Sequence, residues 1–274
     1  MKKVLFIGDS ITHDGRFVSF INAYFMLKKT DEYKIFNAGI PGENLTGLVE
    51  PYHRFKPRPC AMHRVTAVME EVKPDLVIVS YGMNDGIYKD FDEEVFTAFK
   101  NAMIEFIDKI HEYNAKVVVL TPTPYFLDVA REVEEKHSRN YDKVLEIYSD
   151  FIMNDLKNST EQTVDMRSDM IKRMDERIAE DKDFSIREPI HPDFDGHIIM
   201  ARTILREVFS ADYKDFFNKM KADNYNLFEK IRERDNLNHI KLVEKTGHEN
   251  PNKFTKLTEE EIDKRILELT TEIN

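Results

Sequence analysis

Short runs of consecutive apolar, mostly β-branched residues constrain the fold of this chain more than any other feature. Leu76–Val79 and Val117–Val119 contain no polar residue, and Val4–Ile7 has the same character. A strand with one face in water alternates apolar and polar residues, so an unbroken apolar run indicates a strand that is buried on both faces. Helices must then cover the sheet above and below, which predicts parallel strands joined by helical crossovers.

Amphipathic segments of helical length separate these strands, as residues 16–28 show by their apolar spacing. The expected strands are 4–7, 33–37, 76–79, 116–120 and 163–165, and the expected helices are 16–28, 61–72, 93–113, 140–156, 168–180 and 197–209. This alternation predicts an α/β protein with a three-layer α/β/α sandwich and a mainly parallel, flavodoxin-like sheet.

The character of the sequence changes near residue 211. Residues 211–274 are more highly charged than the rest and lack strand signals. Thr258–Glu261 is a capping-box pattern, and an apolar stripe at helical spacing follows it at Ile262, Ile266, Leu269 and Ile273. We expect one α/β domain over residues 1–210 and a charged helical extension over 211–274. The extension is expected to pack on the domain or to form a homo-oligomer interface.

The charge balance excludes several kinds of partner. The 274 residues contain 40 Lys and Arg against 51 Asp and Glu, a net charge of -11. Nucleic acids and anionic membranes attract basic surfaces, so neither is an expected partner. The first apolar run ends at Gly8, short of the roughly 7–15 residues of a secretory signal. With Cys60 as the single cysteine, these features predict a cytoplasmic protein.

Two loops that follow expected strands contain candidate reactive groups. Ser10 lies in Gly8-Asp9-Ser10, at the carboxyl end of the first expected strand, where open α/β sheets place their ligand sites. Taken alone, Ser10 suits a helix N-cap as well as a nucleophile. Asn84 follows the third expected strand, and its side-chain amide is a donor that can stabilise an oxyanion. The sequence around Asn84 is also typical of a turn.

Two further segments contain candidate functional residues. The segment 37–42, Asn-Ala-Gly-Ile-Pro-Gly, follows the second expected strand, and its glycines either admit a ligand close to the backbone or form a plain turn. His191 is a candidate base, and Glu188 is a candidate carboxylate to orient its imidazole. Asp193 and Asp195 are alternative acids. His197 is expected to begin the following helix in a structural role.

Taken in chain order, the four segments resemble the blocks of the SGNH/GDSL hydrolase family, and the match runs from Val4 to about Phe209. The matching motifs are Gly8-Asp9-Ser10, Asn37-x-Gly39-x-x-Gly42, Gly82-x-Asn84-Asp85 and Glu188-x-x-His191. The resemblance implies that Ser10 is the nucleophile, His191 the general base and Glu188 the orienting carboxylate. It also implies an oxyanion hole formed by the Ser10 N–H, the Gly39 N–H and the Asn84 side chain, with no metal or organic cofactor. One departure is that Glu188 stands where the family usually has Asp.

The resemblance implies a serine esterase that forms an acyl-enzyme on Ser10. The absence of a long apolar loop favours short-chain, acetyl esters, on a carbohydrate or another small polar substrate. The alternatives are a lysophospholipase or thioesterase, and a non-catalytic carbohydrate- or acyl-binding module on the same scaffold. A phosphatase of the haloacid dehalogenase type is disfavoured because Ile11 stands where that chemistry needs a second Asp.

Candidate substrate contacts are drawn from the loops beside these segments. Asp9 and Asp85 are expected to brace their loops rather than to react, and Asp9 is also kept as a candidate contact. Tyr and His side chains suit a sugar, and arginines form a candidate patch for an anionic substrate. The candidate contacts are Asp9, Met83, Tyr81 and Tyr125, with Tyr52, His53 and Tyr88 nearby and Arg54, Arg58 and Arg64 as the patch.

Overall fold

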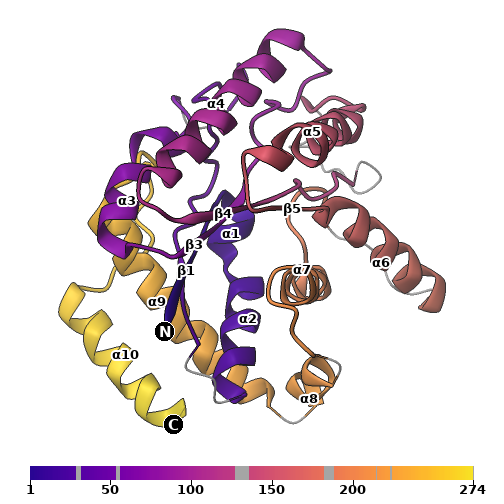
Figure 1. Ribbon diagram of the computed structural model, residues 1–274. Helices are drawn as coiled ribbons and strands as arrows, with labels where there is room; N and C mark the ends of the chain where they lie inside the picture. The colour runs from indigo at the N-terminus through magenta and orange to yellow at the C-terminus, as the bar shows by residue number, and fades with distance from the viewer. Residues whose placement is uncertain are drawn as a thin grey trace.

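The computed structural model describes residues 1–28, 32–53, 56–126, 136–181, 188–213, 215–222 and 224–273. Its five strands form one parallel sheet in the order β2-β1-β3-β4-β5 (Figure 1). The strands are β1 (Lys2–Gly8), β2 (Tyr33–Asn37), β3 (Leu76–Ser80), β4 (Lys116–Leu120) and β5 (Gln162–Val164). This is the strand order of flavodoxin-like folds, so the expected fold class is confirmed.

Helices cover both faces of the sheet (Figure 1). One face packs against α3 (Val65–Val72), α4 (Glu93–His111) and α5 (Tyr141–Asp155). The other face packs against α2 (Arg16–Leu27), α6 (Met166–Glu180) and α7 (Phe194–Glu207). Neighbouring residues of β1 alternate between the two cores, which explains why its sequence is apolar without interruption.

Most predicted helix ends shift by one or two residues, and three helices differ from the sequence prediction by more than that. The short helix α1 (Ser10–Asp14) was expected as loop, and it forms because the Asp9 side chain accepts a hydrogen bond from the Ile11 N–H. The expected helix 61–72 divides into a 3-10 turn, η1 (Ala61–His63), and α3. Helix α7 begins at Phe194 because Asp193 caps it, so the prediction that His197 begins this helix is wrong.

The C-terminal extension consists of α8 (Phe216–Ala222), α9 (Tyr225–Thr246) and α10 (Glu259–Ile273). Helix α9 contacts β2, α2 and α3, and it therefore covers the edge strand of the sheet (Figure 1). Its residues Phe228 and Ile231 are buried in the same core as Val4 and Phe6 of β1. The extension thus shares a core with the α/β domain, while its role in an oligomer stays a prediction.

The second half of the extension is a helical hairpin. Helix α10 packs on α9 through Ile262 and Leu269, which lie on the predicted apolar stripe. The capping box is confirmed, since Thr258 and Glu261 bond reciprocally, each N–H donating to the other's side chain. A short 3-10 turn, η4 (Leu156–Asn158), completes the secondary structure of the described chain. Within the described ranges, no helix has both the length and the apolarity that a membrane span requires.

We expect Phe228→Ala to lower the free energy of unfolding by about 3–5 kcal/mol, because it removes a fully buried ring. The Phe228 ring stacks on Phe20 with the centroids 4.1 Å apart. Urea unfolding followed by circular dichroism measures this change. Leu267→Ala on α10 is the control, because Leu267 is 68% exposed and its loss should change stability little. Equal stability of the two variants would contradict a shared core.

Candidate active site

The strand order brings three of the predicted segments to one place. Strand β1 lies between β2 and β3, so the loops that follow these three strands meet at the carboxyl edge of the sheet. They contribute Ser10, the turn at Gly42 and Asn84, while His191 approaches from the segment before α7. Residues that are far apart in the sequence therefore face one site.

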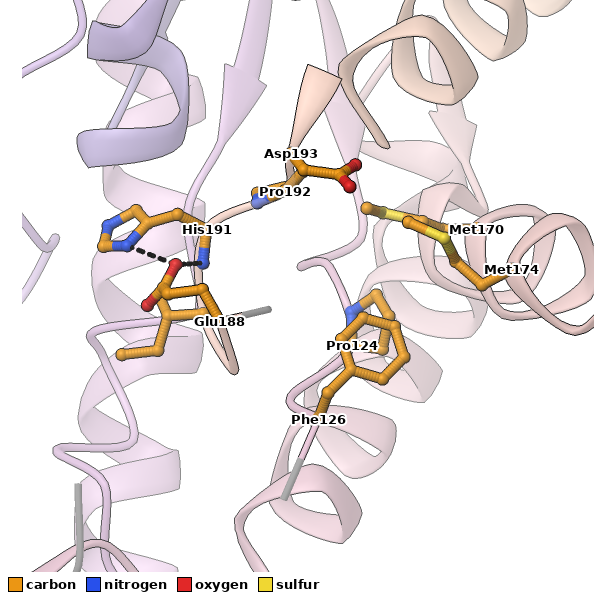
Figure 2. A pocket seen from close by; sticks show the side chains of 9 residues that line it. Pro124, Phe126, Met170, Met174, Glu188, His191, Pro192 and Asp193 are labelled. Carbon is orange, nitrogen blue, oxygen red and sulfur yellow. Dashed lines mark hydrogen bonds and ion pairs between the residues drawn. The ribbon is translucent and has the colours of Figure 1, made fainter. Parts of the chain in front are cut away.

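A continuous chain of hydrogen bonds joins Ser10, His191 and Glu188. The Ser10 Oγ lies 2.8 Å from the His191 Nε2, and the His191 Nδ1 lies 2.9 Å from the Glu188 Oε2. The same carboxylate oxygen accepts the backbone N–H of His191 at 2.5 Å (Figure 2). Glu188 therefore fixes both the ring and the backbone of His191, as its spacing predicts. Asp193 instead accepts the Gly196 N–H as the cap of α7, and Asp195 lies in the first turn of that helix.

The protonation of this pair follows from its contacts. Burial alone lowers the pKa of His191, but the hydrogen bond and charge of Glu188 outweigh it and hold that pKa above the ordinary value of 6.5. Burial raises the pKa of Glu188, and its contacts with His191 reverse this effect, so that the pKa lies below 4.5. Glu188 is therefore ionised near neutral pH and stabilises the imidazolium form of His191.

Two predicted oxyanion-hole donors are available at the site. Ser10 is the first residue of α1, where N–H groups have no partner within the helix. The Asn84 Nδ2 donates to the Glu43 carbonyl at 3.0 Å, and its second hydrogen is left for a ligand. The Tyr88 hydroxyl donates to the Asn84 Oδ1 at 2.9 Å, which fixes the direction of the amide. Tyr88 therefore positions Asn84, and it is buried away from any substrate.

The predicted role of Gly39 as an oxyanion-hole donor needs correction. Its N–H already donates to the Asn37 Oδ1 at 2.9 Å, and a Cβ at this position would lie 2.3 Å from the His13 backbone nitrogen. Gly39 is required because α1 packs directly on it, so its role is in packing. The sequence could not separate Gly39 from Gly42, because either glycine would allow the backbone to approach a substrate closely.

Gly42, in the same segment, lies in a tight turn. The Glu43 N–H donates to the Ile40 carbonyl at 3.2 Å, and Gly42 has a φ of 74°. With Pro41 at the second position, this is a type II turn, which requires a positive φ at its third residue. Asn84 binds the carbonyl of Glu43, the next residue, so the turn lies beside a predicted donor. Within the described chain, the Gly42 N–H has no acceptor and is left for a ligand.

None of the four predicted substrate contacts is open to solvent. Asp9, Tyr81, Met83 and Tyr125 are each at most 3% exposed. The Tyr81 hydroxyl donates to the Glu43 carboxylate at 2.5 Å, and the Met83 carbonyl accepts the Tyr141 hydroxyl. The contacts observed for these residues are therefore with the protein itself, and a direct contact with substrate stays a prediction.

The predicted arginine patch is also absent from the described residues, since Arg58 and Arg64 are buried in ion pairs. Arg58 binds Glu50, and Arg64 binds Glu43 with two hydrogen bonds of 2.6 Å. Both arginines therefore hold the loops of the site and offer no charge to an anionic substrate. Arg54 lies outside the described residues.

Buried carboxyl groups brace the loops, as expected for Asp9 and Asp85. Asp85 accepts the N–H groups of Leu45 and Gly82 and so ties two loops of the site together. Burial raises the pKa of Asp85 to about 7 and that of Asp9 to about 6. Both groups have partners that favour the charged form, and neither bonds to Ser10.

A small apolar cavity lies behind the His191 loop, on the side of α6 (Figure 2). Its volume is about 30 Å³, enough for a single water molecule. Figure 2 shows the His191 ring pointing away from Met170, Met174 and Phe126, which line this cavity. The cavity is therefore too small and wrongly placed to hold a long acyl chain. Among the described residues, no three His, Cys, Asp or Glu side chains form a group suited to a metal ion.

Comparison with known proteins identifies the family of this chain. The model of the GDSL-like lipase/acylhydrolase family matches residues 6–198, and the chain therefore belongs to that family. This membership makes the protein a carboxylic-ester hydrolase, as the four segments predicted. No curated protein matches the chain in sequence.

Solved structures show the same fold at low identity. The acetyl xylan esterase AlAXEase is 24% identical with a TM-score of 0.57, over 75% of this chain and 99% of its own. A catalytic mutant of Axe2, an acetylxylan esterase from Geobacillus stearothermophilus, is 19% identical with a TM-score of 0.54, over 76% and 94%. A gut microbial diltiazem-metabolizing enzyme is 22% identical with a TM-score of 0.57, over 75% of this chain but only 46% of its own.

The pH dependence of catalysis tests the role of Glu188. Protonated His191 cannot accept the Ser10 proton, so kcat/KM should fall as the pH drops through the His191 pKa, which lies above 6.5. We expect Glu188→Gln to move this acid limb to lower pH and to reduce kcat by up to about 10⁴-fold. Asp193→Asn is the control, because Asn also caps helices and should leave kcat unchanged. The opposite pattern would assign the carboxylate role to Asp193.

Proposed function

We propose that this member of the GDSL-like family is a serine esterase for short-chain, above all acetyl, esters of a carbohydrate or another small polar substrate. The hydrogen-bonded chain from Ser10 through His191 to Glu188 is the observation that carries the proposal. Two of the solved structures that share its fold are of acetylxylan esterases, which supports an acetyl group on a sugar as the substrate.

In the proposed reaction, the Ser10 Oγ attacks the ester carbonyl while His191 accepts the Ser10 proton at Nε2. The tetrahedral intermediate then collapses, the C–O bond to the alcohol breaks, and His191 returns the proton to the leaving oxygen. Water attacks the acyl-enzyme in the same way, and the acid and Ser10 are released. Glu188 remains ionised throughout and holds the imidazolium in place. The chemistry needs no metal or organic cofactor.

The charge that develops on the carbonyl oxygen needs donors on the opposite side. We assign this role to the Ser10 N–H, the Gly42 N–H and the second hydrogen of the Asn84 Nδ2. Such donors stabilise the transition state more than the substrate, and each is worth about 2.7–4 kcal/mol. The engaged Gly39 N–H is the reason for placing Gly42 in this set.

The acyl group is proposed to be short because the described site offers little apolar space. The aromatic side chains Tyr81, Tyr88 and Tyr125 are buried in the protein, and the apolar cavity that borders His191 lies on the side away from its ring. A lysophospholipase or thioesterase needs space for a long chain. A non-catalytic binding module would not require the hydrogen-bonded chain of serine, histidine and carboxylate.

A series of p-nitrophenyl esters tests the proposal directly. We expect the highest kcat/KM with the acetate and a steep fall as the acyl chain lengthens, together with acetate release from acetylated xylo-oligosaccharides. Ser10→Ala should abolish both activities, and circular dichroism should show an intact fold. A preference for acyl chains of eight or more carbons would favour the lipase alternative. Activity that survives in Ser10→Ala would refute the serine mechanism.

Asn84→Ala tests the oxyanion hole. We expect kcat on p-nitrophenyl acetate to fall about 10²–10³-fold with little change in KM, because the donor acts on the transition state. Tyr88→Phe removes the hydroxyl that fixes the amide, and it should lower kcat less than Asn84→Ala. A rise in KM alone would show that Asn84 binds substrate and transition state equally.

A further inference from the structure

The C-terminal extension reaches back to the turn that contains Gly42. The family model ends at residue 198, so the extension lies outside the matched region. The Asn250 Nδ2 nevertheless donates to the Pro41 carbonyl at 2.8 Å. The His239 Nε2 lies 2.8 Å from the Gly39 carbonyl, and the Glu249 carboxylate accepts the Cys60 N–H at 3.0 Å. The extension therefore binds the backbone of the site loops at three points.

The contact of Asn250 falls on the peptide group that holds the proposed donor. The Pro41 carbonyl and the Gly42 N–H belong to one planar peptide, and the only cis peptide of the described chain is Lys56–Pro57. In a trans peptide the C=O and the N–H point in opposite directions. A group that fixes the direction of the Pro41 oxygen therefore also fixes the direction of the Gly42 N–H.

The turn alone does not fix this direction. In types I and II, the central peptide of a β-turn points to opposite sides, and the two types share Pro at the second position and the same closing hydrogen bond. Glycine at the third position adopts either type, because it tolerates both signs of φ. The hydrogen bond from Asn250 favours the type II orientation that the structure contains.

Asn250 is itself held in place for this contact. Its side chain is 5% exposed, and its Oδ1 accepts the Asn252 N–H at 2.9 Å, which directs the Nδ2 toward Pro41. The next carbonyl of the turn, that of Gly42, accepts a hydrogen bond from Arg58 at 2.9 Å. Of these neighbouring carbonyls, Pro41 is the one secured by the extension. A bonded carbonyl also polarises its peptide and strengthens the N–H as a donor.

We propose that Asn250 is a positioning residue for catalysis: by binding the Pro41 carbonyl, the C-terminal extension orients the Gly42 N–H toward the developing oxyanion. The inference rests on the proposed function, because it requires Gly42 to be an oxyanion-hole donor. The extension then serves the active site in addition to covering the edge of the sheet.

The test compares two substitutions that introduce the same charge. Asn250→Asp keeps the size of the side chain and its acceptor oxygen but removes the Nδ2 donor. Asn252→Asp is the matched control, because the Asn252 side chain is exposed and two residues away. We expect Asn250→Asp to lower kcat on p-nitrophenyl acetate about 10–100-fold with KM unchanged, and Asn252→Asp to leave both unchanged.

Two further variants separate positioning from loss of stability. Asn250→Ala removes the donor without adding charge, and it should give the same loss of kcat. Phe228→Ala lowers stability through the core around Phe20 and removes no hydrogen bond of the turn, so its kcat should stay at the wild-type value well below its Tm. A loss of kcat with unchanged cooperative thermal unfolding supports positioning. A loss of kcat that appears only together with a loss of cooperative unfolding in both Asn250 variants assigns Asn250 to folding and overturns the inference.

The outcomes distinguish this inference from the proposed function. If Ser10→Ala is inactive but both Asn250 variants keep the wild-type kcat, the inference is overturned and the esterase proposal stands. A rise in KM without a fall in kcat also overturns it, as does an equal loss in Asn252→Asp. If Ser10→Ala remains active, the proposed function fails and the inference fails with it.

Discussion

The position of β1 between β2 and β3, buried on both faces, is the constraint on which the site depends. Parallel strands direct their carboxyl ends to one edge, so three loops that are distant in sequence are forced together there. Ser10 emerges from the central strand, the Gly42 turn from one neighbour and Asn84 from the other. Ser10 therefore lies between two of the proposed oxyanion donors as a result of strand order alone.

Buried ion pairs then hold these loops against each other. Glu43 receives two hydrogen bonds from Arg64 and one from Tyr81, while its own carbonyl binds the Asn84 amide. Burying charges is costly unless each is paired, and a pair that has lost one member destabilises strongly. The arrangement of the loop is therefore enforced by the cost of leaving Glu43 or Arg64 unpaired.

The sequence predicts what depends on local pattern, and it misses what depends on distant partners. The bounds of Tyr33–Asn37 and Lys116–Leu120 were predicted correctly. Only the second is a buried strand with a continuous apolar signal, because Tyr33–Asn37 is half-buried at the sheet edge and contains Lys34. The predicted alignment of Glu188 with His191 is present for a similar reason, since three residues separate them. Arg64 was taken for a surface charge because its partner Glu43 lies 21 residues away. No local sequence pattern indicates an ion pair between residues so far apart in the chain.

The contrast between Gly39 and Gly42 shows why the sequence analysis assigned the backbone oxyanion donor to Gly39. Both are glycines in one short segment, and only the hydrogen bonds of their N–H groups separate them. Pro41-Gly42 is a local signal for a type II turn, which could have identified Gly42 as the residue with positive φ. The partner of that turn, Asn250, lies 209 residues away in a segment outside the family match.

A hydrogen bond to the C=O of a peptide group also fixes the direction of its N–H. Because the C=O and N–H are rigidly coupled, a hydrogen bond on the outer side of the turn controls a donor on the inner side. An extension that first serves to cover an exposed sheet edge can thus gain influence over catalysis by reaching one carbonyl. The geometry of the proposed oxyanion hole is then shared between the α/β domain, which supplies the donors, and the loop between α9 and α10, which contains Asn250.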